Sequence, residues 1–160
     1  MSLVFLGLGT NLGNRPDNLN QAVWMITVEV GEVYSCSSFY ESKPWGFQSE
    51  YNFLNAVVLV NTPYSPEKLL EILKKIESHI GREPHAKGAS YKDRIIDIDI
   101  LIYENRIINR PNLTIPHPHI AKREFVLVPL AEIAPDLIIP MQDKTAKQLK
   151  EELLLKNDEN

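Results

Sequence analysis

The sequence has one cysteine, no hydrophobic run long enough to cross a membrane and no excess of basic residues. Because Cys36 has no second cysteine to pair with, an internal disulfide is excluded; this is typical of a reducing compartment, and we expect a cytoplasmic location. The apolar run at residues 3–8 is short and lacks a basic start, so it predicts neither a signal peptide nor a spanning helix. A formal net charge of -4 argues against a general binder of nucleic acid or anionic membranes.

The common glycine-rich nucleotide motifs are also missing. Gly7, Gly9 and Gly13 bracket a turn, but Leu12 stands where a dinucleotide-binding motif requires glycine. The Gly-Lys-Ser/Thr sequence of a phosphate-binding P-loop is absent from this turn as well. By itself the segment predicts only a tight turn between a strand and a helix.

The order of hydrophobic patterns predicts an α+β protein. Apolar or alternating runs indicate strands, and apolar residues at helical spacing indicate helices. Pro16 and the pair Ser65-Pro66 mark two helix starts, since serine caps helices and proline fits the first turn. We expect, in order, a strand at 3–8, a helix at 16–30, strands at 32–40 and 53–60, a helix at 66–80 and a strand at 94–101.

This β-α-β-β-α-β order is that of the ferredoxin-like fold, an antiparallel sheet with both helices on one face. The opposite face is expected to be open, with long loops at residues 41–51 and 81–94 folded over it. A short hairpin strand at 106–109 and helices at 120–134 and 145–155 extend the C-terminal part. A chain of 160 residues suits one domain, residues 1–160, with its own core.

The strand at 94–101 carries two carboxylates in a run of isoleucine. Residues two apart in a strand share a face, so Asp97 and Asp99 lie on one face and the isoleucines on the other. The pair can be solubilising charge on a wetted face. It can also hold magnesium, which uses one or two carboxylates together with substrate phosphates. Arg94 and the basic stretch before it could then bind those phosphates.

Other polar and aromatic residues are open to two interpretations. Asn55, inside a strand, can pair with a neighbouring loop or with the polar edge of a ligand. The loop with Pro44 and Trp45 can be functional or merely folded on its own aromatics. Glu77 is expected at a solvated helix rim. Two prolines hold His117 in extended backbone, where it can face a phosphate or form a surface turn.

Taken together, the motifs resemble one known family, the 6-hydroxymethyl-7,8-dihydropterin pyrophosphokinases of folate biosynthesis. The resemblance covers nearly the whole chain and depends on the order and spacing of several weak motifs. These are residues 9–13 (GTNLG), 53–56 (FLNA), 94–101 (RIIDIDIL), 116–117 (PH) and 123–125 (REF). Members transfer a pyrophosphoryl group from ATP to the hydroxymethyl group of the reduced pterin and release AMP.

The resemblance implies a role for each candidate residue. Asp97 and Asp99 would hold two magnesium ions and, with Arg82 and Arg94, would be the catalytic residues. The implied ATP-binding residues are Arg82, Arg94, His117, Arg123, Glu77 and Tyr91. The implied pterin-binding residues are Asn55, Phe53, Phe125, Trp45 and Pro44. The expected partners are therefore these two small molecules, without nucleic acid or membrane, and the expected state is a monomer.

The chain departs from the family pattern at three places. Lys92-Asp93 replaces a pair of small residues before Arg94, Tyr91 stands where tryptophan is common, and Pro118 follows His117 where a ring is frequent. Two rival functions remain on sequence grounds. One is a non-catalytic ferredoxin-like module that binds a small ligand. The other is a metal-dependent phosphohydrolase or nuclease that uses the same pair of aspartates.

Overall fold

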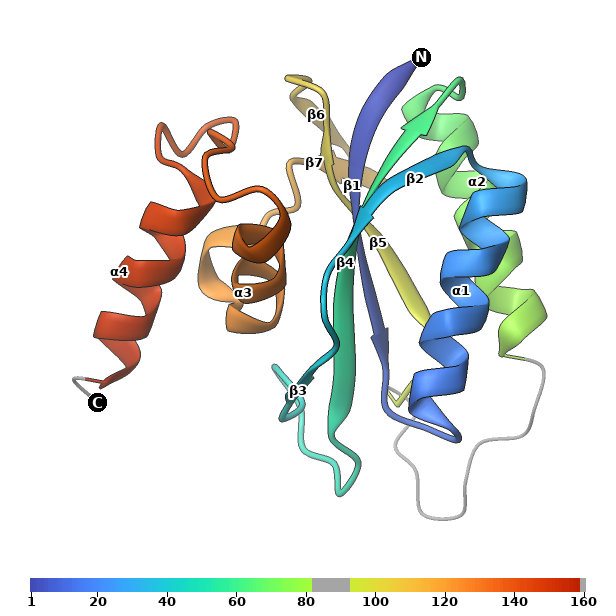
Figure 1. Cartoon of the computed structure of the whole chain (residues 1–160), viewed down its shortest axis with the longest axis horizontal. Coiled ribbons are helices and arrows are strands. Elements are labelled where there is room, and N and C mark those ends of the chain that lie inside the picture. The colour runs from blue at the N-terminus through green and yellow to red at the C-terminus, as the bar shows by residue number, and fades with distance from the viewer. Residues whose placement is uncertain (82–92, 159–160) are drawn as a thin grey trace.

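The structure, a computed structural model, describes residues 1–81 and 93–158. Its centre is an antiparallel sheet in the order β2-β4-β1-β5, with the short strand β3 also paired to β4 (Figure 1). This is an α+β, ferredoxin-like fold, as the sequence predicts. The main strands and helices are β1 (Ser2–Thr10), α1 (Arg15–Glu29), β2 (Glu32–Cys36), β3 (Tyr40–Ser42), β4 (Phe53–Thr62), α2 (Pro66–Ile80) and β5 (Asp97–Tyr103).

Helices α1 and α2 both begin at the predicted signals. The side chain of Asn14 caps α1 by accepting a hydrogen bond from the N–H of Asp17, and Ser65 caps α2 by accepting one from Lys68. Apolar residues of both helices then pack on one face of the sheet, in a cluster with the apolar residues of β1, β4 and β5. Ile96, Ile98 and Ile100 belong to this cluster and are buried, which confirms the face assigned to them.

The C-terminal elements cover part of the other face. They are β6 (Ile108–Arg110), β7 (Leu113–Ile115), the 3-10 turn η1 (Ile120–Lys122), α3 (Glu124–Ile133) and α4 (Ala146–Asp158). Figure 1 shows α3 and α4 on the side of the sheet away from α1 and α2. Leu127 and Leu130 of α3 pack there against Phe5, Val57 and Leu101 in a second buried cluster. The expectation of an open face was therefore wrong for the half under α3.

Several predicted bounds were also wrong. β5 begins at Asp97, so residues 94–96 lead into the strand instead of forming it. The predicted strand at 32–40 is broken into β2 and β3, because three residues leave the sheet between them. The predicted helix at 120–134 divides at Arg123 into η1 and α3, and α3 continues through Pro129. The hairpin strand predicted at 106–109 is present as β6, two residues later at its start, and pairs with β7.

Within the part of the chain that the structure describes, no helix combines the length and the apolar content that crossing a membrane requires.

Candidate active site

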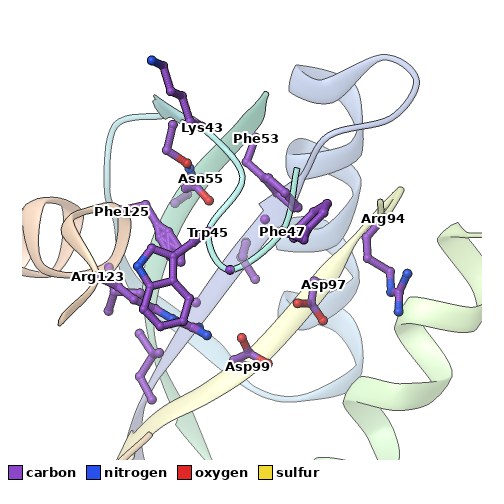
Figure 2. Close-up of a pocket in the computed structure, with 18 residues that line it drawn as sticks. Lys43, Trp45, Phe47, Phe53, Asn55, Arg94, Asp97, Asp99, Arg123 and Phe125 are labelled. Carbon is purple, nitrogen blue, oxygen red and sulfur yellow. The ribbon is translucent and has the colours of Figure 1, made fainter. Parts of the chain in front are cut away.

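A pocket of about 460 Å³ lies on the sheet face that α3 covers only in part. It is lined by the ends of β1, β4 and β5, by residues 42, 43 and 45–47 and by the start of α3. In Figure 2, Asp97 and Asp99 rise from β5, while Phe47 and Phe53 lie on one side of the pocket and Trp45 and Phe125 on the other, with Asn55 between the two pairs. The sheet therefore joins an acidic end and an aromatic end in one cavity.

The acidic end has a floor of glycine. In the β1–β5 ladder, Gly9 pairs with Asp97 and Gly7 pairs with Asp99. Without side chains at these two positions, the space above the carboxylates stays open to a ligand. Burial and the charge of Asp97 raise the pKa of Asp99 to about 7, while Arg123 opposes the shift. The pair is thus unfavourable when both groups are ionised and no cation is bound.

A third carboxyl group lies below the pair. Glu77 is only 17% exposed, and its Oε2 accepts a hydrogen bond of 2.8 Å from the N–H of Ile98. Burial, followed by a hydrogen bond to Asp97 and the charge of Asp97, raises the pKa of Glu77 to about 7. The interpretation of Glu77 as a solvated rim residue was wrong, because the side chain turns from the helix margin toward the start of β5.

These groups can hold magnesium only together with a substrate. Among residues 1–81 and 93–158, no three acidic, histidine or cysteine side chains are grouped closely enough to enclose a metal ion by themselves. Two carboxylates, one of them with a strongly raised pKa, nevertheless form a donor set that fits magnesium, since this ion takes oxygen ligands and completes its shell with phosphate and water. Zinc, which needs about four protein or water ligands including nitrogen or sulfur, fits less well.

Cationic side chains flank the carboxylates. In the view of Figure 2, Asp97 and Asp99 lie between Arg94 on one side and Arg123 on the other. The guanidinium group of Arg123 lies 4.5 Å from the ring centre of Trp45 and 5.3 Å from that of Phe125. Its Nε is buried and has no hydrogen-bond partner among the residues that the structure describes, and burial lowers the pKa of Arg123. The two aromatic rings thus hold this guanidinium group over the pocket by cation–π contacts.

The aromatic end presents rings and one amide. The rings of Phe47 and Phe53 meet edge to face, with 6.1 Å between their centres. The side-chain nitrogen of Asn55 donates to the carbonyl of Tyr40 at 3.0 Å and to the hydroxyl of Ser42 at 2.8 Å. These bonds to β3 fix the amide and leave its oxygen on the side of Gly9 at the pocket floor. The sequence left open whether Asn55 pairs with a neighbouring segment or faces a ligand. In the structure its nitrogen bonds to β3, and the residue also lines the pocket.

His117 lies near the acidic end without lining the pocket. Burial first, then the positive charges of Arg123 and His119, lower the pKa of His117 to about 4. The ring is therefore neutral near pH 7. Its Nδ1 accepts a hydrogen bond of 3.2 Å from the N–H of His119, so its Nε2 carries the proton and remains a donor.

The structure brings most of the predicted residues together. The pocket is lined by Trp45, Phe53, Asn55, Arg94, Asp97, Asp99, Arg123 and Phe125. Pro44 lies instead beside a shallow hollow on the outside of the same loop. Arg82 and Tyr91 lie outside the described residues. Sequence reasoning did not assign Lys43 and Phe47 to the site; their only signal is their place in the long loop.

Comparison with known proteins decides the family. Residues 5–135 match the family described as 7,8-dihydro-6-hydroxymethylpterin-pyrophosphokinase (HPPK). The chain belongs to the HPPK family. A pyrophosphokinase from Porphyromonas gingivalis is 43% identical over 136 residues, which are 84% of this chain and 92% of that protein. One from Aquifex aeolicus is 41% identical over 156 residues, 98% of this chain and 95% of that protein.

A solved structure agrees on the fold. The HPPK-DHPS protein of Plasmodium falciparum superposes with a TM-score of 0.79 at 18% identity, over 100% of this chain and 45% of that longer chain. At this identity the likeness concerns the fold alone. The family match and the curated relatives mean that this HPPK transfers a pyrophosphoryl group to a hydroxymethylpterin in folate biosynthesis, and the rival interpretation as a non-catalytic module is not favoured.

Proposed function

We propose that this HPPK uses ATP as the donor and magnesium at Asp97 and Asp99, and that the pterin occupies the aromatic end of the pocket. The observation that supports this is the cavity itself. One continuous space of about 460 Å³ has paired carboxylates and two arginines at one end and aromatic rings with a fixed amide at the other. A triphosphate with its metal suits the first end, and a flat heterocycle suits the second.

The aromatic end orients the acceptor. Phe53 and Phe125 lie on β4 and at the start of α3, on two sides of the pocket, where they can hold a pterin ring between them. The amide oxygen of Asn55 would accept a hydrogen bond from an N–H of the ring edge. Because Tyr40 and Ser42 already fix this amide, the oxygen is in place before the pterin binds, which lowers the cost of ordering on binding. The hydroxymethyl group is thereby directed along the floor toward the carboxylates.

The acidic end holds the donor. Asp97 and Asp99 would hold the magnesium, which would supply positive charge to neutralise the triphosphate. Arg94 and Arg123 would each bind phosphate oxygens, and the neutral His117 would donate from Nε2. Arg82, Tyr91 and Glu77 complete the set that the family resemblance implies. Arg123 would exchange its contacts with Trp45 and Phe125 for a phosphate, which leaves Phe125 free to meet the pterin.

The reaction then requires positioning more than covalent chemistry by the protein. The pterin hydroxyl oxygen bonds to the β-phosphorus, the bond from that phosphorus to the oxygen shared with the α-phosphate breaks, and AMP leaves while the hydroxyl proton passes to solvent. Charge shifts from the transferred group to the leaving AMP. Arginines on both sides of the carboxylates can follow this shift, which is the usual source of rate in phosphoryl transfer.

AMP formation tests the proposal. The enzyme is incubated with ATP and magnesium, with and without 6-hydroxymethyl-7,8-dihydropterin, and AMP is quantified. AMP that requires the pterin and stops when magnesium is chelated supports the proposal. Hydrolysis of ATP at the same rate without pterin would favour the rival phosphohydrolase instead.

Monomeric state and cytoplasmic location belong to the same proposal. The single cysteine is consistent with a reducing compartment. Light scattering of the purified protein should give the mass of one 18.3 kDa chain.

A further inference from the structure

A buried asparagine joins three segments at the acidic end of the pocket. Asn11, in the turn after β1, is 2% exposed. Its side-chain oxygen accepts from the N–H of Arg94 at 2.7 Å, and its side-chain nitrogen donates to Asp93 at 2.6 Å and to the carbonyl of Tyr51 at 3.1 Å. Its backbone N–H donates to the carbonyl of Arg94 at 2.9 Å. We call these four residues the Asn11 junction.

The junction fixes the backbone of Arg94 on both sides. The N–H and the C=O of Arg94 are both bonded to Asn11, so rotation of this peptide segment is restricted. The Arg94 guanidinium also donates from Nη1 to the carbonyl of Asp93 at 3.0 Å. Arg94 itself lines the pocket beside Asp97. Asn11 and Asp93 thus hold Arg94 in place, the residue whose cationic side chain reaches the site.

Asp93 is unusual for its surroundings. It is 0% exposed, although a buried carboxylate is costly unless it is hydrogen-bonded or paired. Its short bond from Asn11 orients the Asn11 amide, because one side-chain nitrogen is then committed to Asp93 and Tyr51 and the oxygen must face Arg94.

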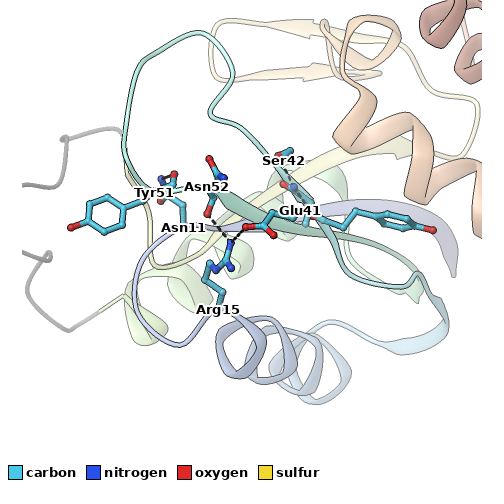
Figure 3. Close-up of polar contacts among 8 residues, drawn as sticks. Asn11, Arg15, Glu41, Ser42, Tyr51 and Asn52 are labelled. Atoms are coloured by element: carbon cyan, nitrogen blue, oxygen red, sulfur yellow. Dashed lines mark hydrogen bonds and ion pairs between the residues drawn. The ribbon is translucent and has the colours of Figure 1, made fainter.

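The junction also links the two ends of the pocket. Tyr51 lies just before β4, which carries Phe53 and Asn55, and Figure 3 shows Tyr51 and Asn52 beside Asn11. A second tie runs close by: Arg15, at the start of α1, donates to Glu41 at 3.1 Å and to the carbonyl of Asn52 at 3.0 Å (Figure 3). Displacement of Asn11 would therefore shift Arg94 relative to the pterin-binding strand.

We propose that Asn11 and Asp93 are positioning residues for Arg94 in pyrophosphoryl transfer. Neither side chain lines the pocket, so they act through Arg94 and not on the substrates. This inference rests on the proposed phosphate-binding role of Arg94. It adds to that role a requirement for Asp93, the carboxylate that directly precedes the arginine.

A double-mutant cycle tests the proposal. Turnover and KM are measured by AMP formation for Asp93→Ala, Asn11→Ala and Arg94→Ala, and for each of the first two combined with Arg94→Ala. Asp93→Ala should lower kcat about tenfold with the KM for pterin within twofold, since an arginine out of place affects the transition state more than pterin binding. In the Arg94→Ala background, the same substitution should change kcat less than twofold.

Two controls separate positioning from loss of stability. Asp93→Asn keeps an oxygen that can accept from Asn11, so it should retain kcat within threefold of wild type. Thr62→Val removes a buried hydrogen bond to Val30 at the far end of β4 and should lower Tm while kcat at 25 °C stays unchanged. If Asn11→Ala fails to fold, the milder variant Asp93→Ala still tests the proposal.

The outcomes distinguish the two proposals. Equal losses from Asp93→Ala in the wild-type and Arg94→Ala backgrounds, or an Asp93→Asn variant as impaired as Asp93→Ala, would overturn the positioning role alone. An Arg94→Ala enzyme with wild-type kcat and KM for ATP would overturn the phosphate-binding role of Arg94, and the positioning proposal with it.

Discussion

Replacement of Asp99 by asparagine should make the metal-free protein more stable. Burial and the charge of Asp97 raise the pKa of Asp99 from 3.8 to about 7. Since a tenfold change in proton affinity corresponds to about 1.4 kcal/mol, keeping Asp99 ionised in the folded protein at pH 8 costs up to about 4 kcal/mol. Asparagine has nearly the same volume and no charge. Because solvent reaches the pocket and screens part of the repulsion, we expect a gain of about 1 to 3 kcal/mol.

The pH dependence gives this prediction its sign. A carboxyl group whose pKa is higher in the folded than in the unfolded protein favours the folded state when it is protonated. This stabilisation is fully present below the unfolded pKa and is lost as the pH rises through the folded pKa. The advantage of Asp99→Asn should therefore be near zero at pH 4, grow up to pH 7 and stay constant above it. Thermal unfolding in a chelator from pH 4 to pH 8 measures it, and each kcal/mol corresponds to about 2 to 4 °C in Tm for a chain of this size.

A control and a metal titration complete the experiment. Glu151→Gln removes an exposed charge on α4, far from the pocket, and should change stability by less than about 0.5 kcal/mol. Magnesium with a nucleotide should stabilise the wild type and have much less effect on Asp99→Asn. A lower stability of Asp99→Asn at pH 8, or a gain independent of pH, would refute the reasoning that the unliganded carboxylate pair is held under repulsion.

Three further substitutions probe the pocket and the sheet. Phe125→Ala should raise the KM for pterin at least tenfold with a smaller effect on the KM for ATP, and steady-state AMP formation measures both; equal changes would place Phe125 outside pterin binding. Gly9→Val should fold but lose pterin binding in calorimetry, because a Cβ there lies 3.4 Å from the Asn55 oxygen and the branches would fill the floor; retained affinity would contradict this pocket geometry. Gly31→Ala should destabilise the protein by more than about 2 kcal/mol in urea unfolding, since its Cβ would lie 2.0 Å from the carbonyl oxygen of Asn61; an unchanged midpoint would show that the helix-to-strand turn can relax.

The sequence predicted the parts of this fold whose causes are local. Ser65-Pro66 marks the start of α2 because a cap and a proline act within one turn. The alternation of aspartate and isoleucine assigned Asp97 and Ile98 to opposite faces because strand geometry alone determines this. The position of α3 could not be read in the same way. Which sheet face a C-terminal helix covers depends on the path of the chain after β7, and no local pattern encodes that path.

The residues of the site divide in the same way, into those that a local pattern predicts and those that depend on long-range contacts. Local propensity made the paired aspartates conspicuous, since aspartate is a poor strand residue. The local pattern placed Glu77 at a solvated helix rim, because the environment that buries it is made by β5, which begins 20 residues further along the chain. Asn11 was interpreted as an ordinary turn residue, since its side-chain partners Tyr51 and Asp93 are 40 and 82 positions away. Contacts of this range depend on the assembled sheet, so the family resemblance, and not the local pattern, supplied most of the ligand-binding roles.

The most direct test of the account is the magnesium dependence of AMP formation in the Asp97→Asn and Asp99→Asn variants. Rates are measured with saturating ATP and 6-hydroxymethyl-7,8-dihydropterin over a magnesium titration, with Glu151→Gln as the matched control. The account predicts that both variants fold, bind pterin as the wild type does and lose at least about a thousandfold in kcat at every magnesium concentration, since metal-assisted charge stabilisation contributes several kcal/mol to such transfers. Either variant turning over within tenfold of the control, with an unchanged magnesium midpoint, would contradict the claim that this carboxylate pair holds the metal.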